Sequence, residues 1–484
     1  MIETDFVQEL FIGGEWLEAA SGNTFEVINP SNGTAIATMP DGGRADTQRA
    51  IDAASSAQTG WAEITAAERA SIMMKAAGLM RERGEHLARV IALEQGRPIT
   101  QARTEIPYAA SFVEWFAEEA KRVYGETIPA SSPDKRILVV KTPVGVTAAI
   151  TPWNFPAAAI TRKLAPALAA GCTMIIKPSE LTPLTALEIA KIFEEAGLPG
   201  GVLSVVTGMD PVPISLALME DSRVRKLSFT GSTEVGKLLM RGAADTMKRL
   251  SLELGGHSPF IVFEDADLEA AVQNAIGSKM RNMGQTCVCA NRIFVHRTVM
   301  EEFTERLVER LREMQIADAL DEDSEVGPLI GPEGVEKVER HVEDAISKGA
   351  RLALGGNRLD RPGCFFEPTV LLDVDRTMLV TQEETFGPVA ALMPFDSEDE
   401  VIERANDTSY GLAAYYFTRD VGRLWRLAEQ LQYGILGAND GLPSAAQAPF
   451  GGVKESGFGR EGSRHGLEEY LDIKYVSLGG ISSR

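Results

Sequence analysis

The segment KLSFTGSTEVGKLLM, residues 226–240, has the pattern of a strand that runs through a glycine turn into a helix. Gly231 and Gly236 flank the turn, and Ser232 stands where the helix would begin. The same alternation extends to both sides, with strands predicted at 174–177, 202–206 and 226–229 and helices at 157–169, 182–196 and 233–243. Strands that alternate with helices in this way indicate a parallel, doubly wound sheet.

The turn at Gly231 and Ser232 could bind a pyrophosphate, because backbone N–H groups and the dipole at a helix start attract anions. Its glycines do not have the spacing G-x-G-x-x-G of the common dinucleotide fingerprint. Taken by itself, the turn is equally compatible with an ordinary connection between a strand and a helix.

A second alternating region begins near residue 259. Its predicted elements are a strand at 259–263, a helix near 267–283, a strand at 292–296 and a long helix after residue 299. The pattern continues past residue 430, so we expect a second α/β domain. The length of 484 residues supports this division, because it exceeds what a single core usually holds.

The region before these domains is predicted to be mostly helical after a short strand-rich start. Thr65 and Glu68 have the spacing of a capping box, and apolar residues then recur at helical intervals. We therefore predict that a helix begins directly after Thr65.

Two strand-like segments have no neighbour within these domains. They are the ribbon around 134–143 and the alternating tail GLEEYLDIKYVSL at 466–478. A strand without a local partner invites pairing with another subunit, and the ribbon is the natural counterpart of the tail. We predict that 134–143 and 466–484 form an oligomerisation arm and that the protein is a homo-oligomer, either a dimer or a tetramer.

The charge excludes several classes of partner. The formal net charge is −21 and the sequence pI is about 4.8, so nucleic-acid phosphates and anionic membranes would be repelled. The most apolar stretch, 164–176, is far shorter than the ~20 residues of a membrane span. The acidic N-terminus MIETDFVQEL does not resemble a signal peptide. We expect a cytoplasmic protein that binds neither nucleic acid nor a membrane.

The motif GQTCVCANR, residues 284–292, places Cys287 and Cys289 one residue apart. Four cysteines are too few for a disulfide framework and indicate a reducing compartment. The Cys-x-Cys spacing, with no histidine nearby, argues against structural zinc, so no metal is expected. Cys287 and Cys289 are then either a redox couple or one nucleophile beside a second cysteine that has no chemical role. A nucleophilic thiol needs a polarised pocket, because its ordinary pKa is about 8.5.

Three further motifs carry polar groups suited to catalysis or cofactor binding. Asn154 lies between two prolines in TPWNFP, where a fixed amide could stabilise an oxyanion or merely satisfy a turn. Glu253 precedes two glycines in SLELGG, where a half-buried carboxylate could act as a base; a solvent-exposed glutamate at a strand edge is the alternative.

In MIIKPSELTP, Lys177 and Glu180 follow a strand at the sheet edge where ligands of such sheets bind. A carboxylate there can accept both hydroxyls of an adenosine ribose and repels a 2′-phosphate. The alternative is a helix-capping turn in which Ser179 starts the helix.

Taken together, the motifs identify the chain as resembling the aldehyde dehydrogenase superfamily over nearly its whole length. The motifs that carry the resemblance are TPWNFP, KPSE, FTGST, LELGG, GQTC, EETFGPV at 383–389 and PFGGVKESGFGREG at 449–462. Within this superfamily, three motifs are similar to the succinate-semialdehyde dehydrogenases: YAASFVEWFAEEAKRVYGETIP, ITPWNFPAAAITRK and GQTCVCANR.

The resemblance implies the aldehyde dehydrogenase fold, with a Rossmann-like NAD-binding domain, an α/β catalytic domain and a small β arm for oligomerisation. The implied boundaries are 1–133 and 144–254 for the NAD-binding domain, 255–440 for the catalytic domain, and 134–143 with 466–484 for the arm. Residues 441–465 would return to the NAD-binding domain and the substrate tunnel.

The resemblance also implies roles for single residues. Cys287 would be the nucleophile, Glu253 the general base and Asn154 the oxyanion donor. The cofactor, NAD with NADP also possible, would be held by Trp153, Lys177, Ser179, Glu180, Gly231, Ser232, Glu384 and Phe386. Glu180 favours NAD, since relatives that prefer NADP often have a small residue at this position.

The implied reaction is oxidation of a small-molecule dicarboxylic semialdehyde, succinate semialdehyde first, through a thiohemiacetal and a thioester. Arg162, Arg281 and Ser444 match the residues that bind the distal carboxylate, although each arginine could instead make an internal salt bridge. The loop NDGLPSAAQA at 439–448 departs from the expected pattern. Glutarate semialdehyde, 2-oxoglutarate semialdehyde or a broader range of aldehydes therefore remain alternatives.

Some relatives close a reversible Cys-x-Cys disulfide. Cys289 is therefore either a redox partner of Cys287 or a buried cysteine that serves only packing.

Two other functional classes compete with hydrolytic dehydrogenation. In a CoA-acylating relative a thiol replaces water, and the presence of Glu253 argues against it. A non-catalytic scaffold would have no reason to keep Cys287, Glu253 and Asn154 together.

Overall fold

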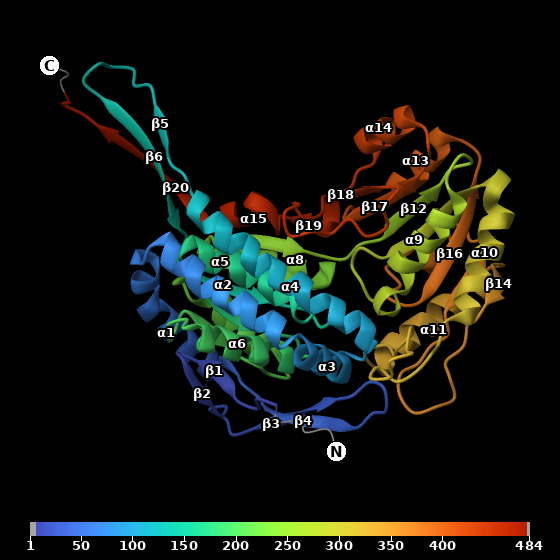
Figure 1. Cartoon of the computed structure of the whole chain (residues 1–484), viewed down its shortest axis with the longest axis horizontal. Helices are drawn as coiled ribbons and strands as arrows, with labels where there is room; N and C mark the ends of the chain where they lie inside the picture. The colour runs from blue at the N-terminus through green and yellow to red at the C-terminus, as the bar shows by residue number, and fades with distance from the viewer. Residues whose placement is uncertain (1–5, 482–484) are drawn as a thin grey trace.

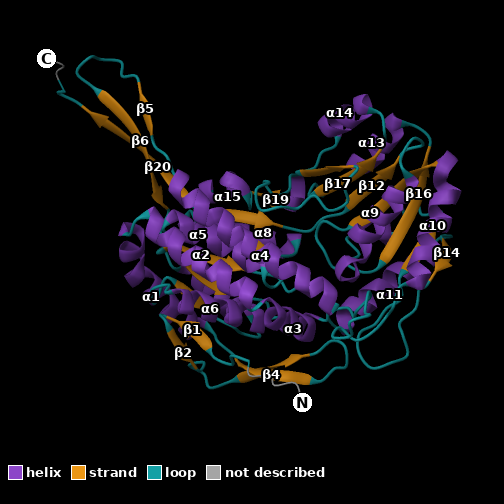
Figure 2. Cartoon of the chain, viewed as in Figure 1, coloured by secondary structure: helices purple, strands orange, loops and turns teal. Residues whose placement is uncertain are grey.

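The computed structural model describes residues 6–481 as two α/β units, each built on one large sheet, with a narrow arm that projects from the first unit (Figure 1). Helices pack around both sheets, and the strands of the arm stand apart from them (Figure 2). No helix in the described range has the length and apolar character needed to cross a membrane.

The first sheet has the strand order β19-β11-β10-β7-β8-β9-β1-β2. The inner strands from β11 to β9 run parallel, whereas β19 and β1 pair antiparallel with their neighbours, as does β2 with β1. The bounds are β1 Leu10–Ile12, β2 Glu15–Leu17, β7 Val146–Ile150, β8 Thr173–Lys177, β9 Leu203–Val205, β10 Val224–Thr230, β11 Arg249–Glu253 and β19 Gly457–Phe458.

Helices cover both faces of this sheet, because successive residues of its strands point to opposite sides. Ala149 and Ile176 belong to one apolar core, whereas Ala148 and Ile175 belong to another. The helices of this unit are α1 Arg44–Glu63, α2 Ala66–Glu82, α3 Gly84–Gln95, α4 Ile99–Glu119, α5 Ala158–Ala170, α6 Leu184–Ala196, α7 Pro211–Glu220, α8 Thr233–Ala243 and α15 Ser463–Glu468. The predicted doubly wound sheet is therefore confirmed.

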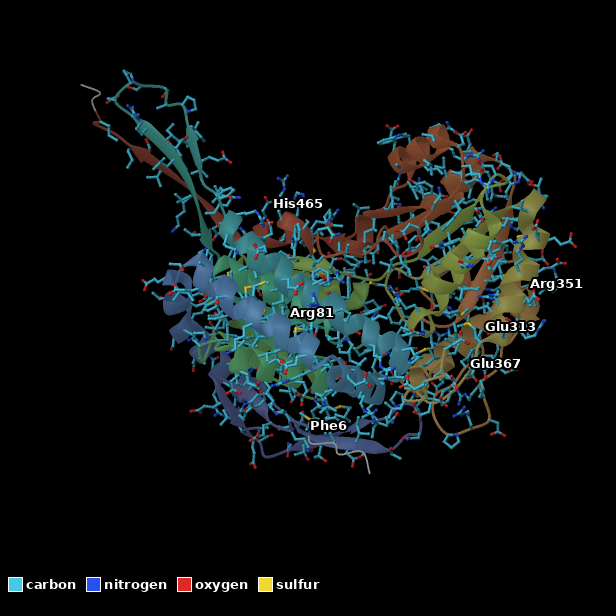
Figure 3. The ribbon with its side chains drawn as sticks, in the orientation of Figure 1. Phe6, Arg81, Glu313, Arg351, Glu367 and His465 are labelled. Atoms are coloured by element: carbon cyan, nitrogen blue, oxygen red, sulfur yellow. The ribbon has the colours of Figure 1, made fainter. Side chains whose placement is uncertain are left out.

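The second sheet has the order β14-β15-β16-β13-β12-β17-β18 and is parallel except for β14. Its strands are β12 Ser258–Val262, β13 Ala290–His296, β14 Arg351–Leu354, β15 Thr369–Leu372, β16 Val389–Phe395, β17 Ala413–Phe417 and β18 Ile435–Ala438. Its helices are α9 Leu268–Met280, α10 Met300–Glu313, α11 Pro332–Ser347, α12 Leu379–Gln382, α13 Glu398–Asn406 and α14 Val421–Gln430. Charged side chains such as Arg81, Glu313 and Arg351 stand on the outer surface of both units (Figure 3).

The arm is a three-stranded sheet in the order β20-β6-β5. β20 Leu471–Leu478 pairs antiparallel with β6 Arg136–Pro143 along its whole length, so the tail and the ribbon are partners within one chain. The arm begins earlier than residue 134, because β5 Glu126–Ile128 joins β6. The tail prediction extended to 484, and residues 482–484 lie outside the described part, as do 1–5. A separate hairpin joins β3 Thr24–Ile28 to β4 Ala35–Pro40.

One predicted helix is too long. The expected helix near 267–283 ends at Met280, because Asn282 and Met283 have φ values of 51° and 53° and cannot continue a right-handed helix. The chain instead makes a tight turn, Arg281–Gly284, before the cysteine motif. This turn places the residues that follow it against the first sheet.

Candidate active site

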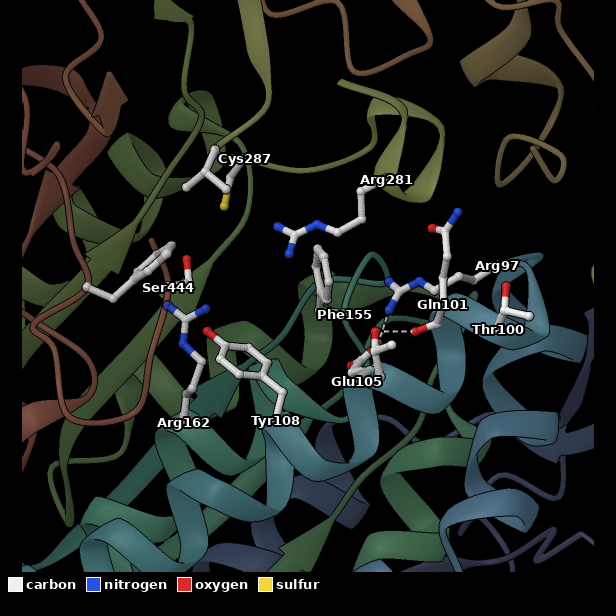
Figure 4. A pocket seen from close by; sticks show the side chains of 13 residues that line it. Arg97, Thr100, Gln101, Glu105, Tyr108, Phe155, Arg162, Arg281, Cys287 and Ser444 are labelled. Atoms are coloured by element: carbon white, nitrogen blue, oxygen red, sulfur yellow. Dashed lines mark hydrogen bonds and ion pairs between the residues drawn. The ribbon is translucent and has the colours of Figure 1, made fainter. Parts of the chain in front are cut away.

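Two cavities meet at Cys287. The first has a volume of about 350 Å³ and is lined by α4, α5 and the turn after α9 (Figure 4). The second has a volume of about 520 Å³ and is lined by the loop after β7, the start of α8 and the start of α11. Cys287 lines both, so its sulfur can be reached by one molecule in each cavity.

Two glycines allow the cysteine segment to approach the end of β11. A β-carbon on Gly256 would lie 2.2 Å from the carbonyl oxygen of Cys287, and one on Gly255 would lie 3.0 Å from a carboxylate oxygen of Glu384. The backbone contact excludes any side chain at Gly256, whereas a side chain at Gly255 would require Glu384 to move. The glycine pair after Leu254 is thus a point of close approach.

Asn154 is buried in the loop between β7 and α5. Its side-chain amide donates to the carbonyl oxygen of Gln285 at 3.0 Å, and its own carbonyl oxygen accepts from Arg97. A primary amide has two N–H groups, so one remains for a ligand in the second cavity, which Asn154 lines. The arrangement fixes the direction of this amide near Cys287.

Glu253 is the last residue of β11 and is only 2% exposed, so the alternative of a solvent-exposed edge glutamate is wrong. Neither carboxylate oxygen has a hydrogen-bond partner among residues 6–481. Burial, and then the nearby Glu461 carboxylate, hold the pKa of Glu253 well above its ordinary value. A carboxyl group with a raised pKa is a stronger base, which suits proton abstraction near neutral pH.

The Cys287 thiol is half-buried, and loss of solvation raises its pKa to about 12. The guanidinium groups of Arg162 and Arg281 lower the pKa, whereas the carboxylates of Glu384 and Glu253 raise it. The thiol is therefore protonated at neutral pH in the free protein. Its activation requires a base or an additional positive charge at the site.

Cys289 lies in different surroundings from Cys287. Its side chain is fully buried, and its sulfur accepts from the ammonium group of Lys279 at 3.4 Å. The same ammonium group donates to the side-chain oxygen of Asn291 at 3.0 Å. Both cysteines are free thiols. Cys289 is thus packed behind the reactive loop and does not line either cavity.

The second cavity has the groups expected of a dinucleotide site. Ser232 caps α8, since its hydroxyl accepts from the backbone N–H of Val235, and it lines the cavity beside Gly231. The rings of Trp153 and Phe386 meet edge to face with centroids 5.5 Å apart. A helix start suits a phosphate and an aromatic wall suits a flat ring, so these residues fit a nicotinamide dinucleotide.

Glu384 lines the same cavity and is partly exposed. One of its carboxylate oxygens accepts from the backbone N–H of Gly256 at 3.1 Å. Burial raises the pKa of Glu384 to about 7. An acceptor held in this way is suited to the hydroxyls of a ribose, and it changes charge in the physiological range of pH.

Lys177 and Glu180 form an ion pair of 2.7 Å at the carboxyl end of β8. Lys177 is buried and Glu180 is partly exposed. Neither residue lines the second cavity, and nor does Ser179. The alternative in which Ser179 starts the helix is wrong, because α6 begins at Leu184. The Ser179 hydroxyl instead accepts from the backbone N–H of Leu181 at 3.3 Å.

The start of α6 is capped from another helix. The buried carboxylate of Glu94 in α3 accepts from the backbone N–H groups of Leu184 at 2.8 Å and Thr185 at 3.0 Å. The carboxylate of Glu105 in α4 caps the start of α5 in the same way. It accepts from the backbone N–H groups of Ala157 and Ala158, each at 2.9 Å. The ends of these two helices are therefore fixed by residues distant in sequence, which local capping patterns cannot reveal.

The first cavity contains both predicted arginines, but their surroundings differ. Arg162 pairs with the buried carboxylate of Glu461 at 2.7 Å and lies over the ring of Phe450. Arg281 has no ion pair among residues 6–481, and its Cζ atom lies 5.3 Å from the centroid of the Phe155 ring. The alternative in which the arginine makes an internal salt bridge therefore holds for Arg162 and not for Arg281. Arg281 is the cation more available to an anionic ligand.

Ser444 and Tyr108 complete the polar wall of the first cavity, with the tyrosine hydroxyl directed toward Arg162 (Figure 4). Sequence reasoning missed Tyr108, and it missed Arg97 and Gln101 at the other end of the cavity. Tyr108 begins the motif YAASFVEWFAEEAKRVYGETIP, which contributes to the resemblance but assigns the tyrosine no role, and Arg97 and Gln101 stand in no motif. No group of acidic, histidine or cysteine side chains in the described range could hold a metal ion.

A thiol between a dinucleotide cavity and a small anion-receptive cavity defines a cofactor-dependent oxidoreductase of aldehydes. The chain belongs to the aldehyde dehydrogenase family, whose sequence model matches residues 16–476, and it is an NAD(P)-dependent aldehyde dehydrogenase. The fold predicted from the resemblance is confirmed by solved structures.

Three relatives illustrate the similarity. The chain is 54% identical to a glutarate-semialdehyde dehydrogenase of Pseudomonas putida over 98% of both chains. It is 53% identical to an NADP-dependent succinate-semialdehyde dehydrogenase of Escherichia coli, again over 98% of both. The solved succinate-semialdehyde dehydrogenase of Burkholderia pseudomallei has a TM-score of 0.97, 53% identity and 98% coverage of both chains.

Proposed function

We propose that the protein oxidises a dicarboxylic semialdehyde, with succinate semialdehyde as preferred substrate, to the corresponding acid with NAD as hydride acceptor. The unpaired Arg281 guanidinium in the cavity that ends at Cys287 carries this proposal. A guanidinium pairs with a carboxylate through two parallel hydrogen bonds, which would direct the aldehyde end of the substrate toward the thiol. Ser444 and Arg162 would contact the same carboxylate.

In the proposed reaction, the Cys287 thiol loses its proton to solvent water, and the thiolate adds to the aldehyde carbon. The oxyanion of the thiohemiacetal accepts a hydrogen bond from the free N–H of Asn154. A bound nicotinamide would supply a positive charge and the acceptor for the hydride that leaves the thiohemiacetal carbon, so that a thioester on Cys287 remains. Glu253 then removes a proton from water, which hydrolyses the thioester on Cys287 and releases the acid.

NAD is the proposed cofactor because Glu180 would accept the adenosine ribose hydroxyls and repel a 2′-phosphate. Lys177 would approach the same ribose, with Ser179 in the turn between them. Gly231 and Ser232 would hold the pyrophosphate, and Glu384 and Phe386 the nicotinamide ribose. Trp153 would line the cleft. One relative is named for NADP and a solved relative is in complex with NAD, so the carboxylate of Glu180 is the feature on which the choice of NAD rests.

Glutarate semialdehyde is the second candidate substrate. It is supported by the name of the Pseudomonas putida relative and by the unusual loop 439–448, which carries Ser444. The purified protein should be assayed with succinate, glutarate and uncharged aldehydes for NADH formation and for free acid in the absence of CoA. Preference for a dicarboxylic semialdehyde supports the proposal. Equal turnover of uncharged aldehydes, or a requirement for CoA, would overturn it.

The arm is proposed to pair subunits into a dimer or tetramer. Ile473 and Tyr475 of β20 are 72% and 64% exposed, so this strand presents apolar side chains to solvent in the single chain. Burying them against another subunit would be favourable. Light scattering of the full-length protein should give a multiple of the monomer mass, and Ile473→Glu with Tyr475→Glu should reduce it.

A further inference from the structure

Asn282 is a fully buried residue in the turn between Arg281 and Cys287. Its φ of 51° lies in the left-handed region, and Met283 follows with a φ of 53°. Asparagine tolerates this region better than most residues, whereas methionine does not. Two successive residues with positive φ need strong support from their surroundings.

That support comes from hydrogen bonds to every polar atom of Asn282. Its backbone N–H donates to the side chain of Gln101 at 2.8 Å, and its backbone carbonyl accepts from the N–H of Gln285 at 2.9 Å. Its side-chain oxygen accepts from Gln95 at 2.8 Å. Its side-chain amide donates to the carbonyl oxygens of Asn154 at 3.1 Å and Gln285 at 3.3 Å.

The two carbonyl groups that accept from this amide belong to the proposed catalytic machinery. One is the backbone of Asn154, the proposed oxyanion donor. The other belongs to Gln285, two residues before the nucleophile, and the Asn154 side chain also donates to it. The Asn282 amide therefore joins the backbone of the oxyanion donor to the segment that carries Cys287, directly after the Arg281 that would bind the substrate.

We propose that Asn282 is a positioning residue that holds the Asn154 amide and the Cys287 segment in one fixed arrangement. The inference rests on the proposed aldehyde oxidation and adds to it a residue that touches neither substrate nor cofactor. Displacement of a reacting group by about 1 Å can cost about 100-fold in rate, so a bridge at this place matters for turnover. Substrate and cofactor affinity depend on other residues.

The test is Asn282→Asp in the full-length enzyme. Aspartate has the same shape and also tolerates positive φ, but it presents an oxygen where the amide N–H group donates to two carbonyl oxygens. We expect kcat to fall by about 10- to 100-fold, while the KM for semialdehyde and the Kd for NAD from fluorescence titration change by less than about threefold. Glycine permits the positive φ of this position but has no side-chain amide. Asn282→Gly should therefore also lower kcat while the KM for semialdehyde and the Kd for NAD stay nearly unchanged.

Asn29→Asp is the matched control. Asn29 is also buried and its side-chain oxygen accepts a backbone N–H, that of Ser31 at 2.8 Å, but it lies beside the hairpin of β3 and β4. This control should keep both kcat and the Kd for NAD, because aspartate retains the oxygen that accepts from Ser31. The inference is overturned if Asn282→Asp and Asn282→Gly keep kcat, or if kcat, NAD affinity and thermal midpoint fall together. Inactive wild-type protein would instead refute the proposed function.

Discussion

The carbonyl oxygen of Cys287 lies 2.2 Å from the position that a β-carbon on Gly256 would occupy. Gly256→Ala must therefore push the cysteine segment away from the end of β11. Because misplacement of the nucleophile by about 1 Å can cost about 100-fold, we expect a loss of kcat of that order with NAD binding retained.

A matched substitution separates this effect from the general cost of replacing glycine. A β-carbon on Gly78 in α2 would meet nothing within 4 Å. Gly78→Ala should keep full activity and raise stability by up to about 1 kcal/mol, since alanine is the better helix former. If Gly256→Ala is as active as Gly78→Ala, the close approach has no catalytic consequence.

The two arginines of the substrate cavity should differ when each is replaced by alanine. Arg281→Ala should reduce kcat/KM for dicarboxylic semialdehydes by the ~1.5–3 kcal/mol of a charged hydrogen bond, with little effect on uncharged aldehydes. Steady-state kinetics with both substrate types measure this. Equal losses for both types would contradict the role of Arg281 in carboxylate binding.

Arg162→Ala should also destabilise the fold, because it removes one partner of the buried Glu461 carboxylate. Breaking a buried ion pair typically costs about 3–5 kcal/mol, and Lys163, which also pairs with Glu461, should reduce that cost. Thermal unfolding of the two variants gives the comparison. A stable Arg162→Ala beside an unstable Arg281→Ala would show that the assignments are reversed.

Cofactor affinity should depend on pH through Glu384. Burial raises the pKa of this group to about 7, so it is protonated below that pH and ionised above it. The ionised carboxylate is the better acceptor for ribose hydroxyls. The Kd for NAD should therefore rise as the pH falls from 8 to 6, and the slope should vanish in Glu384→Gln. A pH-independent Kd in the wild type would contradict this role.

Replacement of Glu180 should change the choice of cofactor. Glu180→Ala removes the carboxylate that would repel a 2′-phosphate and releases Lys177 from its 2.7 Å ion pair. We expect the ratio of kcat/KM for NADP to that for NAD to rise by about tenfold or more, equivalent to about 1.4 kcal/mol. An unchanged ratio would mean that Glu180 does not contact the ribose.

Much of the fold could be predicted from the sequence, because strand periodicity, helix periodicity and capping boxes depend on residues that are close together in the chain. The strand, turn and helix at 226–243 were recognised from apolar periodicity, and the capping box of Thr65 and Glu68 is confirmed by reciprocal hydrogen bonds at the start of α2. Ser179 failed as a cap because the helix start is satisfied by Glu94, ninety positions away. Long-range caps leave no trace in the neighbouring sequence.

The site was predicted unevenly for the same reason. Cys287, Asn154 and Glu253 stand in distinctive motifs. Asn154 follows β7 and Glu253 ends β11, two parallel strands of the first sheet, whereas Cys287 precedes β13 of the second sheet. Asn282 was missed, although an asparagine shortly before a glycine at a helix end signals a left-handed turn. The partners that make it important, Gln95 and Gln101, come from a separate part of the chain and could be found only in three dimensions.

The central claim is that Cys287 becomes covalently bound to the substrate carbon and that Glu253 is needed to release it. Glu253→Gln mixed with NAD and succinate semialdehyde should form one equivalent of NADH and retain an acyl group, located on Cys287 by peptide mass mapping. NADH formation without an adduct on Cys287, or with the adduct on another residue, would contradict the account.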